Sequence, residues 1–225
     1  TDPSDVVVCA NTSTSSVNFS GTGTSYSWTN NTPGIGLAAS GTGNIGPFTA
    51  QNTGLTPVVA TITVNPDFTG GSASCAGLSQ TFTITVNPIP TVNDLPDQTV
   101  CNGSSFQALQ FTGTGTAYAW VNNTPSIGLS SNGTANISSF TGTNTTVSPV
   151  TGTITVTPQY TNLGLTCSGV VQTIALTVNP TPSVVDPQDL VVCNGSPTAA
   201  VVFSGTGTSY SWTNSNPTIG LVATG

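Results

Sequence analysis

The stretch Ser20–Leu37 reads SGTGTSYSWTNNTPGIGL, and close copies of it occur twice more along the chain. Its tryptophan recurs at an interval of 92 residues, and the cysteines keep the same interval, without an insertion or deletion. A constant interval of this length indicates a tandem array of one structural unit. We therefore divide the chain into repeat 1 (1–90), repeat 2 (91–182) and the first part of repeat 3 (183–225).

Working outward from this stretch, alternating apolar residues predict β-strands. Ser25–Asn30 places Tyr26 and Trp28 on one face, and Val58–Val64 and Thr81–Val86 alternate in the same way. No segment shows helical periodicity. About seven short strands per repeat, with turn residues between them, are typical of a β-sandwich, so we expect an all-β fold of tandem sandwiches. Shorter strands are also predicted at Asp5–Cys9 and Ser16–Ser20.

Two sets of recurring residues are expected to stabilise each repeat, which is small for an independent core. The three tryptophans Trp28, Trp120 and Trp212 are the predicted core anchors. The cysteines are interpreted as one disulfide within each repeat, closing a loop worth roughly 4 kcal/mol; the alternative is buried free thiols. Disulfides indicate an oxidising, extracellular compartment. The predicted pairs are Cys9–Cys75 and Cys101–Cys167, and Cys193 lies in the partial repeat, without an equivalent partner.

The composition argues against several classes of function. The chain has no Lys, Arg or His, and its seven acidic residues are all Asp. General acid–base catalysis normally uses His, Glu, Lys or a tuned Asp, so we expect no enzyme active site here. Without Lys or Arg the chain cannot neutralise phosphates, so no nucleic acid partner is expected. No apolar run is long enough to span a bilayer, so no membrane insertion is expected.

Proline-rich segments join the repeats, at 87–98 and 179–189. Closely spaced prolines favour a stiff, extended connector, so we expect a semi-rigid rod of roughly 70–90 Å for two repeats. Aspartates cluster at these joints. They are interpreted as solvated turn residues, and the alternative is a calcium ion held between repeats. No cofactor is expected apart from that alternative, whose candidate ligands are Asp94, Asp97, Asp186 and Asp189.

Aromatic residues outside the predicted core are candidates for contact with something else. Phe68 and Tyr160 occupy equivalent positions, which we expect in the loop between the last two strands. Paired aromatics at a loop tip could contact a ligand such as a carbohydrate, or a neighbouring repeat.

The motifs SGTGTSYSW, NxxPxIGL, Cys-Asn-Gly-Ser (Cys101–Ser104) and TFTITVNP (Thr81–Pro88) together resemble PKD-like, immunoglobulin-like repeats. Such repeats occur in very large surface adhesins of Bacteroidetes-type bacteria. The resemblance covers the whole chain and implies a seven-stranded sandwich with the tryptophan on the third strand. It also implies export by the type IX secretion system and, in some members, gliding. The chain departs from ordinary PKD domains after the tryptophan, where Thr29–Pro33 replaces an acidic, glycine-containing motif.

These observations favour a non-catalytic stalk or filament shaft of a secreted cell-surface adhesin. The expected partners are neighbouring repeats of the same chain, together with other surface proteins or surface polysaccharide. Two alternatives remain open at this point: a carbohydrate- or ligand-binding module, and a spacer in a large secreted enzyme.

Overall fold

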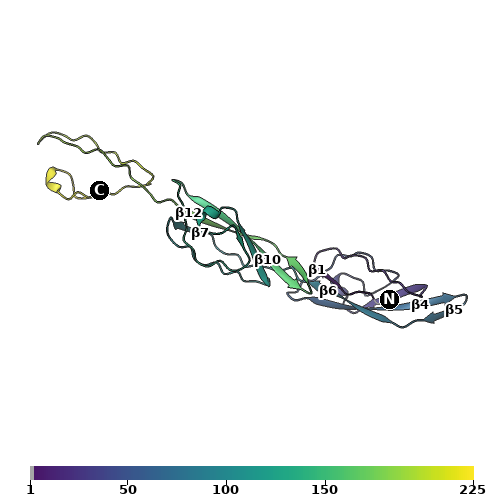
Figure 1. The fold of residues 1–225 in the computed structure, drawn as a ribbon. Coiled ribbons are helices and arrows are strands. Elements are labelled where there is room, and N and C mark those ends of the chain that lie inside the picture. The colour runs from purple at the N-terminus through teal and green to yellow at the C-terminus, as the bar shows by residue number, and fades with distance from the viewer. Residues whose placement is uncertain (1–2) are drawn as a thin grey trace.

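The computed structural model describes residues 3–225. Repeats 1 and 2 are all-β sandwiches that follow one another end to end, and the partial third repeat continues in the same direction (Figure 1). This confirms the prediction of tandem immunoglobulin-like β-sandwich domains. No helix within residues 3–225 is both long and apolar enough to cross a membrane.

Each of the first two repeats has one six-stranded sheet with the same topology. In repeat 1 the order is β1-β6-β4-β2-β3, and β5 pairs with the far part of β4. β1 runs parallel to β6, and the other pairs are antiparallel. The strands of repeat 1 are β1 (Val6–Cys9), β2 (Ser25–Asn30), β3 (Ser40–Thr42), β4 (Val58–Gly70), β5 (Ala73–Ala76) and β6 (Gln80–Asn87).

Repeat 2 reproduces this sheet in the order β7-β12-β10-β8-β9, with β11 paired to β10. The register shifts by the repeat interval, so that Trp120 lies opposite Val156 as Trp28 lies opposite Val64. The strands of repeat 2 are β7 (Gln98–Cys101), β8 (Ala117–Asn122), β9 (Asn132–Gly133), β10 (Val150–Asn162), β11 (Leu165–Ser168) and β12 (Gln172–Asn179).

The second layer of the sandwich consists of extended segments that pair only at single bridges. In repeat 1 these bridges join Val17 to Ile45 and Ser13 to Thr49. The predicted strand Ser16–Ser20 is therefore reduced to the one bridge at Val17. Ile45 is nevertheless buried in the core cluster, so this irregular layer still covers the inner face of the sheet.

The stretch that recurs in every repeat forms β2 and a tight turn after it. The side chain of Asn30 donates to the carbonyl of Leu37 at 3.0 Å and accepts from the backbone N–H of Thr32 at 2.9 Å. A 3-10 helix, η1 (Pro33–Ile35), follows and ends at Gly36 with φ of 94°. A side chain at Gly36 would also collide with the carbonyl of Thr49, because an added Cβ would lie 2.3 Å from that oxygen. Pro and Gly in NxxPxIGL thus fix the turn.

Trp28 lies in the core of repeat 1, as the core-anchor interpretation requires, and packs against a glycine. A Cβ added to Gly41 on β3 would lie 2.2 Å from the Trp28 ring, so only glycine leaves room for the indole. Trp120 and Gly133 repeat this arrangement in repeat 2. Both indoles are 6% exposed and belong to the core clusters of their repeats.

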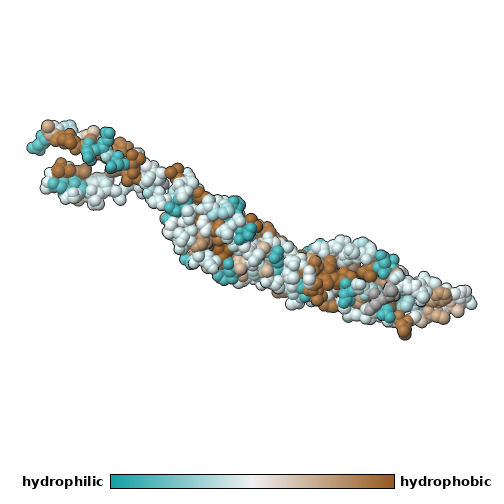
Figure 2. Space-filling view, viewed as in Figure 1, coloured by the Kyte–Doolittle hydropathy of each residue, from teal (hydrophilic) through white to brown (hydrophobic). Residues whose placement is uncertain are grey.

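The third repeat shows the same turn without the surrounding core. Its 3-10 helix, η3 (Pro217–Ile219), matches η1 and η2 (Pro125–Ile127). Ile219 is 70% exposed, whereas its equivalent Ile35 is fully buried. Residues 183–225 contain no equivalents of β4 and β6, and these two strands and their counterparts supply six of the thirteen buried core residues in repeat 1 and five of the thirteen in repeat 2. Figure 2 accordingly shows hydrophobic side chains gathered on the two separated segments of residues 183–225.

Aspartates at the start of each repeat hold β1 or β7 to the last strand. The carboxylate of Asp5 accepts from the backbone N–H of Thr83 at 2.7 Å, and Asp97 accepts from Ala175 at the same distance. The hydrogen bonds from Thr83 favour the ionised carboxylate, and they lower the pKa of Asp5 below its ordinary value of 3.8.

This shift predicts an acid-dependent contribution to stability. A carboxylate whose pKa is lowered by folding stabilises the folded state above its unfolded pKa, and that contribution is lost as the pH falls through the folded pKa. The stability of wild type should therefore fall faster with acidification below about pH 4 than that of Asp5→Asn, which keeps an acceptor oxygen but does not titrate. Thermal unfolding of both proteins between pH 2 and pH 6 checks this. Superimposable pH profiles would contradict the role of Asp5.

Candidate functional site at the junction between repeats

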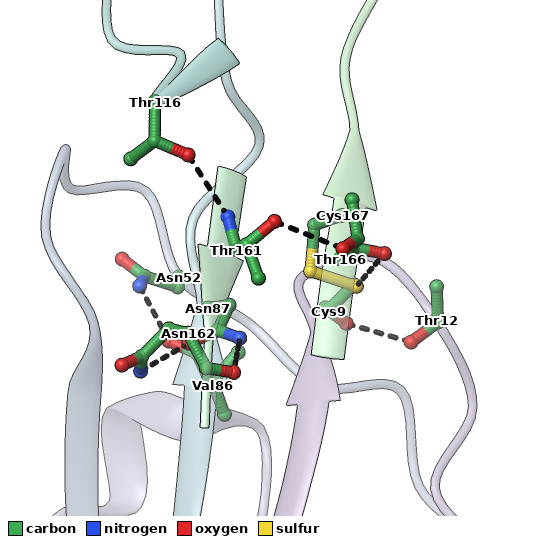
Figure 3. The surroundings of a disulfide bond; sticks show 10 residues. All are labelled: Cys9, Thr12, Asn52, Val86, Asn87, Thr116, Thr161, Asn162, Thr166 and Cys167. Atoms are coloured by element: carbon green, nitrogen blue, oxygen red, sulfur yellow. Dashed lines mark hydrogen bonds between the residues drawn. A yellow bond between two sulfur atoms is a disulfide. The ribbon is translucent and has the colours of Figure 1, made fainter. Parts of the chain in front are cut away.

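The most distinctive feature of the molecule is a covalent link between the first two repeats. Cys9 at the end of β1 forms a disulfide with Cys167 on β11, with a Cα–Cα distance of 5.6 Å. The bond closes a sequence separation of 158 residues. Figure 3 shows the β10–β11 hairpin of repeat 2 reaching alongside the end of β1, so that the two sulfurs meet between the repeats.

The predicted pairs Cys9–Cys75 and Cys101–Cys167 are therefore wrong. Cys75, Cys101 and Cys193 are free and exposed in this structure.

The physical reason lies in the length of β4. Cys9 lies beside the strand end where Val58 pairs with Val86, whereas Cys75 lies opposite Phe68. Ten residues of β4 separate these two points, or about 33 Å at the rise of a β-strand. A disulfide requires Cα atoms within roughly 7 Å, so the two cysteines of one repeat cannot bond. The end-to-end arrangement instead brings the hairpin of one repeat to the base of the previous repeat.

Two asparagines form a second link across the junction. The side chain of Asn162 donates to the side-chain oxygen of Asn87 at 2.9 Å, and Asn87 donates to the backbone carbonyl of Asn162 at 3.4 Å (Figure 3). Asn87 is completely buried. Its backbone carbonyl also accepts from Ala10 beside the disulfide, and Asn52 donates to the neighbouring carbonyl of Val86. A buried amide with satisfied hydrogen bonds fixes geometry more than an apolar contact does.

The linker between the repeats is fixed to repeat 2 rather than left free. Thr91 donates its backbone N–H to the hydroxyl of Thr114 at 2.9 Å, and Thr114 donates its own N–H to the Thr91 carbonyl at 3.2 Å. Two residues further, Asn93 and Thr112 exchange two hydrogen bonds of 2.7 Å. This is consistent with the stiff connector expected from its prolines.

A glycine permits the close approach of the linker to the hairpin. A Cβ added to Gly169, just after β11, would lie 1.8 Å from the carbonyl oxygen of Pro90. Any side chain at this position would push the linker away from repeat 2. Gly169 is therefore part of the junction, together with the disulfide and the asparagine pair.

The paired aromatics lie in strands, which corrects the expectation of a loop. Phe68 belongs to β4 and faces Cys75 on β5, whereas Tyr160 belongs to β10 and faces Cys167 on β11. Phe68 is 52% exposed, and Tyr160 at the equivalent place in the junction hairpin is only partly exposed. Whether these rings contact a ligand or a neighbouring repeat stays a prediction.

The calcium alternative for the aspartates at the joints stays a prediction. Within residues 3–225, no group of three or more His, Cys, Asp or Glu side chains is placed to hold a metal ion. Of the four candidate calcium ligands Asp94, Asp97, Asp186 and Asp189, Asp97 accepts the backbone hydrogen bond described above. Asp2 lies outside the described residues.

The junction residues other than the cysteines were not found from the sequence. The sequence does mark Asn87 as a recurring position, because the segment Asn-Pro-x-Pro is found at the end of the last strand in both repeats. That segment was interpreted only as a connector. Asn162 is not periodic, because repeat 1 has Gly70 in its place, whereas Gly169 recurs as Gly77.

The asparagine pair gives a testable expectation. Asn87→Ala removes both hydrogen bonds between the repeats and should destabilise the reduced protein by about 1–3 kcal/mol, the usual range when a buried hydrogen-bonded group is lost. Asn179→Ala is the matched control, because Asn179 occupies the equivalent position at the end of repeat 2 and should cost much less. Urea unfolding with the disulfide reduced measures both. Equal losses would show that the pair across the junction contributes nothing specific.

No family model matches the chain, and no curated protein matches it either. Among solved structures, the chain is similar to the I67–I69 fragment of the I-band of titin, with 13% identity and a TM-score of 0.39. That match covers 80% of this chain and 65% of the fragment, so the chain spans slightly less than two thirds of the titin fragment.

Two further solved structures are similar to this chain at lower TM-scores. The human mucin-like protocadherin EC1-2 has 12% identity and a TM-score of 0.32, with 80% of this chain and 97% of that chain covered. The Ig1-2 module of the Drosophila receptor protein tyrosine phosphatase DLAR has 10% identity and a TM-score of 0.25, with 78% and 96% covered. Likenesses this weak carry no argument about function. The assignment of tandem immunoglobulin-like β-sandwiches therefore rests on the sheet topology and layers of the chain itself.

Proposed function

We propose that this chain is the non-catalytic, load-bearing shaft of a secreted cell-surface adhesin. The observation that carries the proposal is the junction, where a disulfide, an asparagine pair and a fixed linker join two sandwiches end to end. A connection of this kind suits a protein that must keep its length and direction. An interface between independently moving domains would need none of these links.

Other properties of the chain support the same proposal. A disulfide between repeats needs an oxidising compartment, which favours an extracellular location. Without Lys and Arg the chain has no site for trypsin-like proteases, and without His it has no side chain that normally titrates near neutral pH. These properties suit a fibre exposed to a variable environment. The repeats then extend a terminal binding or anchoring domain away from the cell.

The finer identity follows from the sequence motifs. On that basis we propose a gliding-adhesin-like protein exported by the type IX secretion system, with surface proteins or polysaccharide as the partners of its tip. The repeats themselves bind neighbouring repeats.

The axial spacing of a shaft follows from the junction. The disulfide Cα atoms are 5.6 Å apart. Along the paired strands of repeat 2, eleven residues separate the level of Cys167 from the level of Cys101, which is the equivalent of Cys9. At the rise of a β-strand, and with the disulfide added, each repeat therefore advances about 40 Å along the shaft.

Cryo-electron microscopy of surface material from the producing cells tests this function. A beaded fibre with one sandwich about every 40 Å is expected. A compact particle, in which this segment folds against another domain, would overturn the shaft and favour a spacer in a larger secreted protein. Small-angle X-ray scattering of the isolated chain provides a second readout, and a folded-back pair of repeats would count against the proposal.

A further inference from the structure

Two of the exposed cysteines lie at positions equivalent to the two cysteines of the junction disulfide. Cys101 ends β7 as Cys9 ends β1, and Cys75 lies on β5 as Cys167 lies on β11. Cys167 is 1% exposed within the junction, whereas Cys75 is exposed at the outer end of repeat 1. Each free cysteine therefore has an equivalent residue in this structure that is bonded to an adjacent repeat.

The burial of other junction residues shows the same pattern. Asn87 is completely buried and bonds to Asn162 of repeat 2, while its equivalent Asn179 at the end of repeat 2 is only half-buried. At the opposite end, half-buried Tyr160 corresponds to Phe68, which is mostly exposed. The end of repeat 2 that carries Cys101 therefore corresponds to one side of the junction, and the β4–β5 hairpin of repeat 1 corresponds to the other. Neither surface has an occupant among the described residues.

The second linker already positions a third repeat as the first linker positions repeat 2. Ser183 donates its backbone N–H to the hydroxyl of Thr206 at 2.8 Å, the equivalent of Thr91 and Thr114. Val184 bridges to Gly205 as Val92 bridges to Gly113. Because the linker enters repeat 3 in the same way, the hairpin of a complete third repeat would reach back to Cys101.

We propose that the link between repeats recurs along a longer array, so that Cys101 bonds to the hairpin cysteine of a complete third repeat and Cys75 bonds to the base of a preceding one. The inference deepens the proposed shaft and rests on it. Each bond forms by thiol–disulfide exchange. Two cysteine thiols become one disulfide, and an oxidised dithiol oxidoreductase takes up the two electrons and two protons as its own disulfide opens to two thiols.

The recurrence would make the array nearly inextensible. Each bond spans 158 residues, but the repeat interval is 92, so successive closed loops overlap. A covalent path then runs from Cys9 across the disulfide to Cys167 and along the backbone to Cys193, where the next disulfide begins. This path contains only 26 backbone residues for every two repeats. Fully extended, this route measures roughly 90–100 Å including the disulfide, against about 80 Å for two folded repeats.

The same two repeats without the bonds would behave differently under load. If both sandwiches unfolded, their 184 residues would extend to roughly 600–660 Å. The recurrent bond therefore limits the length of the shaft by covalent structure and not by the stability of each sandwich. This is the property expected of a tether that transmits force.

A chain completed with its own sequence tests the recurrence. Residues 134–182 of repeat 2 are appended after Gly225, which completes repeat 3 and adds a copy of Cys167. The protein is refolded with an oxidised glutathione couple and digested without reduction with chymotrypsin, since trypsin has no site. Mass spectrometry is expected to find Cys9 bonded to Cys167 and Cys101 bonded to the appended cysteine, with Cys75 and Cys193 free.

The possible failures are distinguishable. If Cys9 is not bonded to Cys167, the junction and the shaft built on it both fail. If Cys9 bonds to Cys167 but the appended cysteine bonds to Cys193 or remains free, only the recurrence is overturned. The variant Cys101→Ser in the same completed chain is the control. It should leave one more reactive thiol, the appended cysteine, and a new bond from that cysteine to Cys193 would contradict the proposed geometry.

Discussion

Replacing Cys9 with Ser should lower the free energy of unfolding of the joined repeats by about 5 kcal/mol, because the disulfide closes a loop of 158 residues and removes that much loop-closure entropy from the unfolded chain. The free energy of unfolding is measured by guanidinium titration of the oxidised proteins. Cys75→Ser is the control, because Cys75 is exposed and free and should leave the unfolding curve unchanged. A Cys9→Ser protein that unfolds like wild type would contradict the disulfide between repeats.

Mechanical unfolding gives the same bond a second, independent readout. When the chain is pulled from its two ends, the disulfide shields the residues between Cys9 and Cys167 from the force. Cys9→Ser should therefore lengthen the fully unfolded chain by roughly 520–570 Å, the contour length of those residues. Single-molecule force spectroscopy resolves such a difference. Adding a reductant to wild type should reproduce the longer extension, whereas an unchanged extension would show that the bond does not bridge the repeats.

How far the sequence could predict this molecule depended on whether a feature was local. The alternation around Trp28 predicted β2 with the bounds that the structure has. In β4 the apolar alternation ends at Val64, and the following Asn-Pro-Asp resembles a turn, but the strand continues through Pro66 to Gly70. Pro66 is tolerated where Tyr26 faces it, and its carbonyl accepts from Gly77. Propensity therefore underestimated this strand.

The sequence predicts the disulfide within each repeat because the same pair of cysteines recurs in repeats 1 and 2. The longer β4–β5 hairpin carries Cys75 to the far end, and only the packing of one repeat on the next brings Cys9 and Cys167 together. Contacts between repeats leave no mark in the periodicity within a repeat, so the sequence alone could not choose between the two pairings.

The two tryptophan sites differ in one hydrogen bond that the sequence did not reveal. The indole N–H of Trp120 donates to the carbonyl of Ala135 at 2.8 Å. The indole N–H of Trp28 has no partner among the described residues. The residue equivalent to Ala135 in repeat 1 is Gly43, which has a φ of 69°. This left-handed conformation is open to glycine and costly for alanine, so the backbone next to Trp28 follows a different course.

Trp28→Ala should destabilise repeat 1 by about 3–5 kcal/mol, because it removes a buried indole and leaves a cavity beside Gly41. Trp120→Ala should destabilise repeat 2 by about 1 kcal/mol more than that, since it also removes the hydrogen bond to Ala135. Trp212→Ala is the matched control, because its indole is half-buried in the partial repeat and its loss should cost far less.

Thermal unfolding of the three variants, followed by circular dichroism, ranks these costs. The disulfide must be reduced in all samples, because the bond to Cys167 couples the unfolding of repeat 1 to that of repeat 2. If Trp28→Ala melts like Trp212→Ala, the indole is no core anchor. If Trp28→Ala and Trp120→Ala lose equal stability, the hydrogen bond to Ala135 adds nothing, and the cavity alone accounts for both.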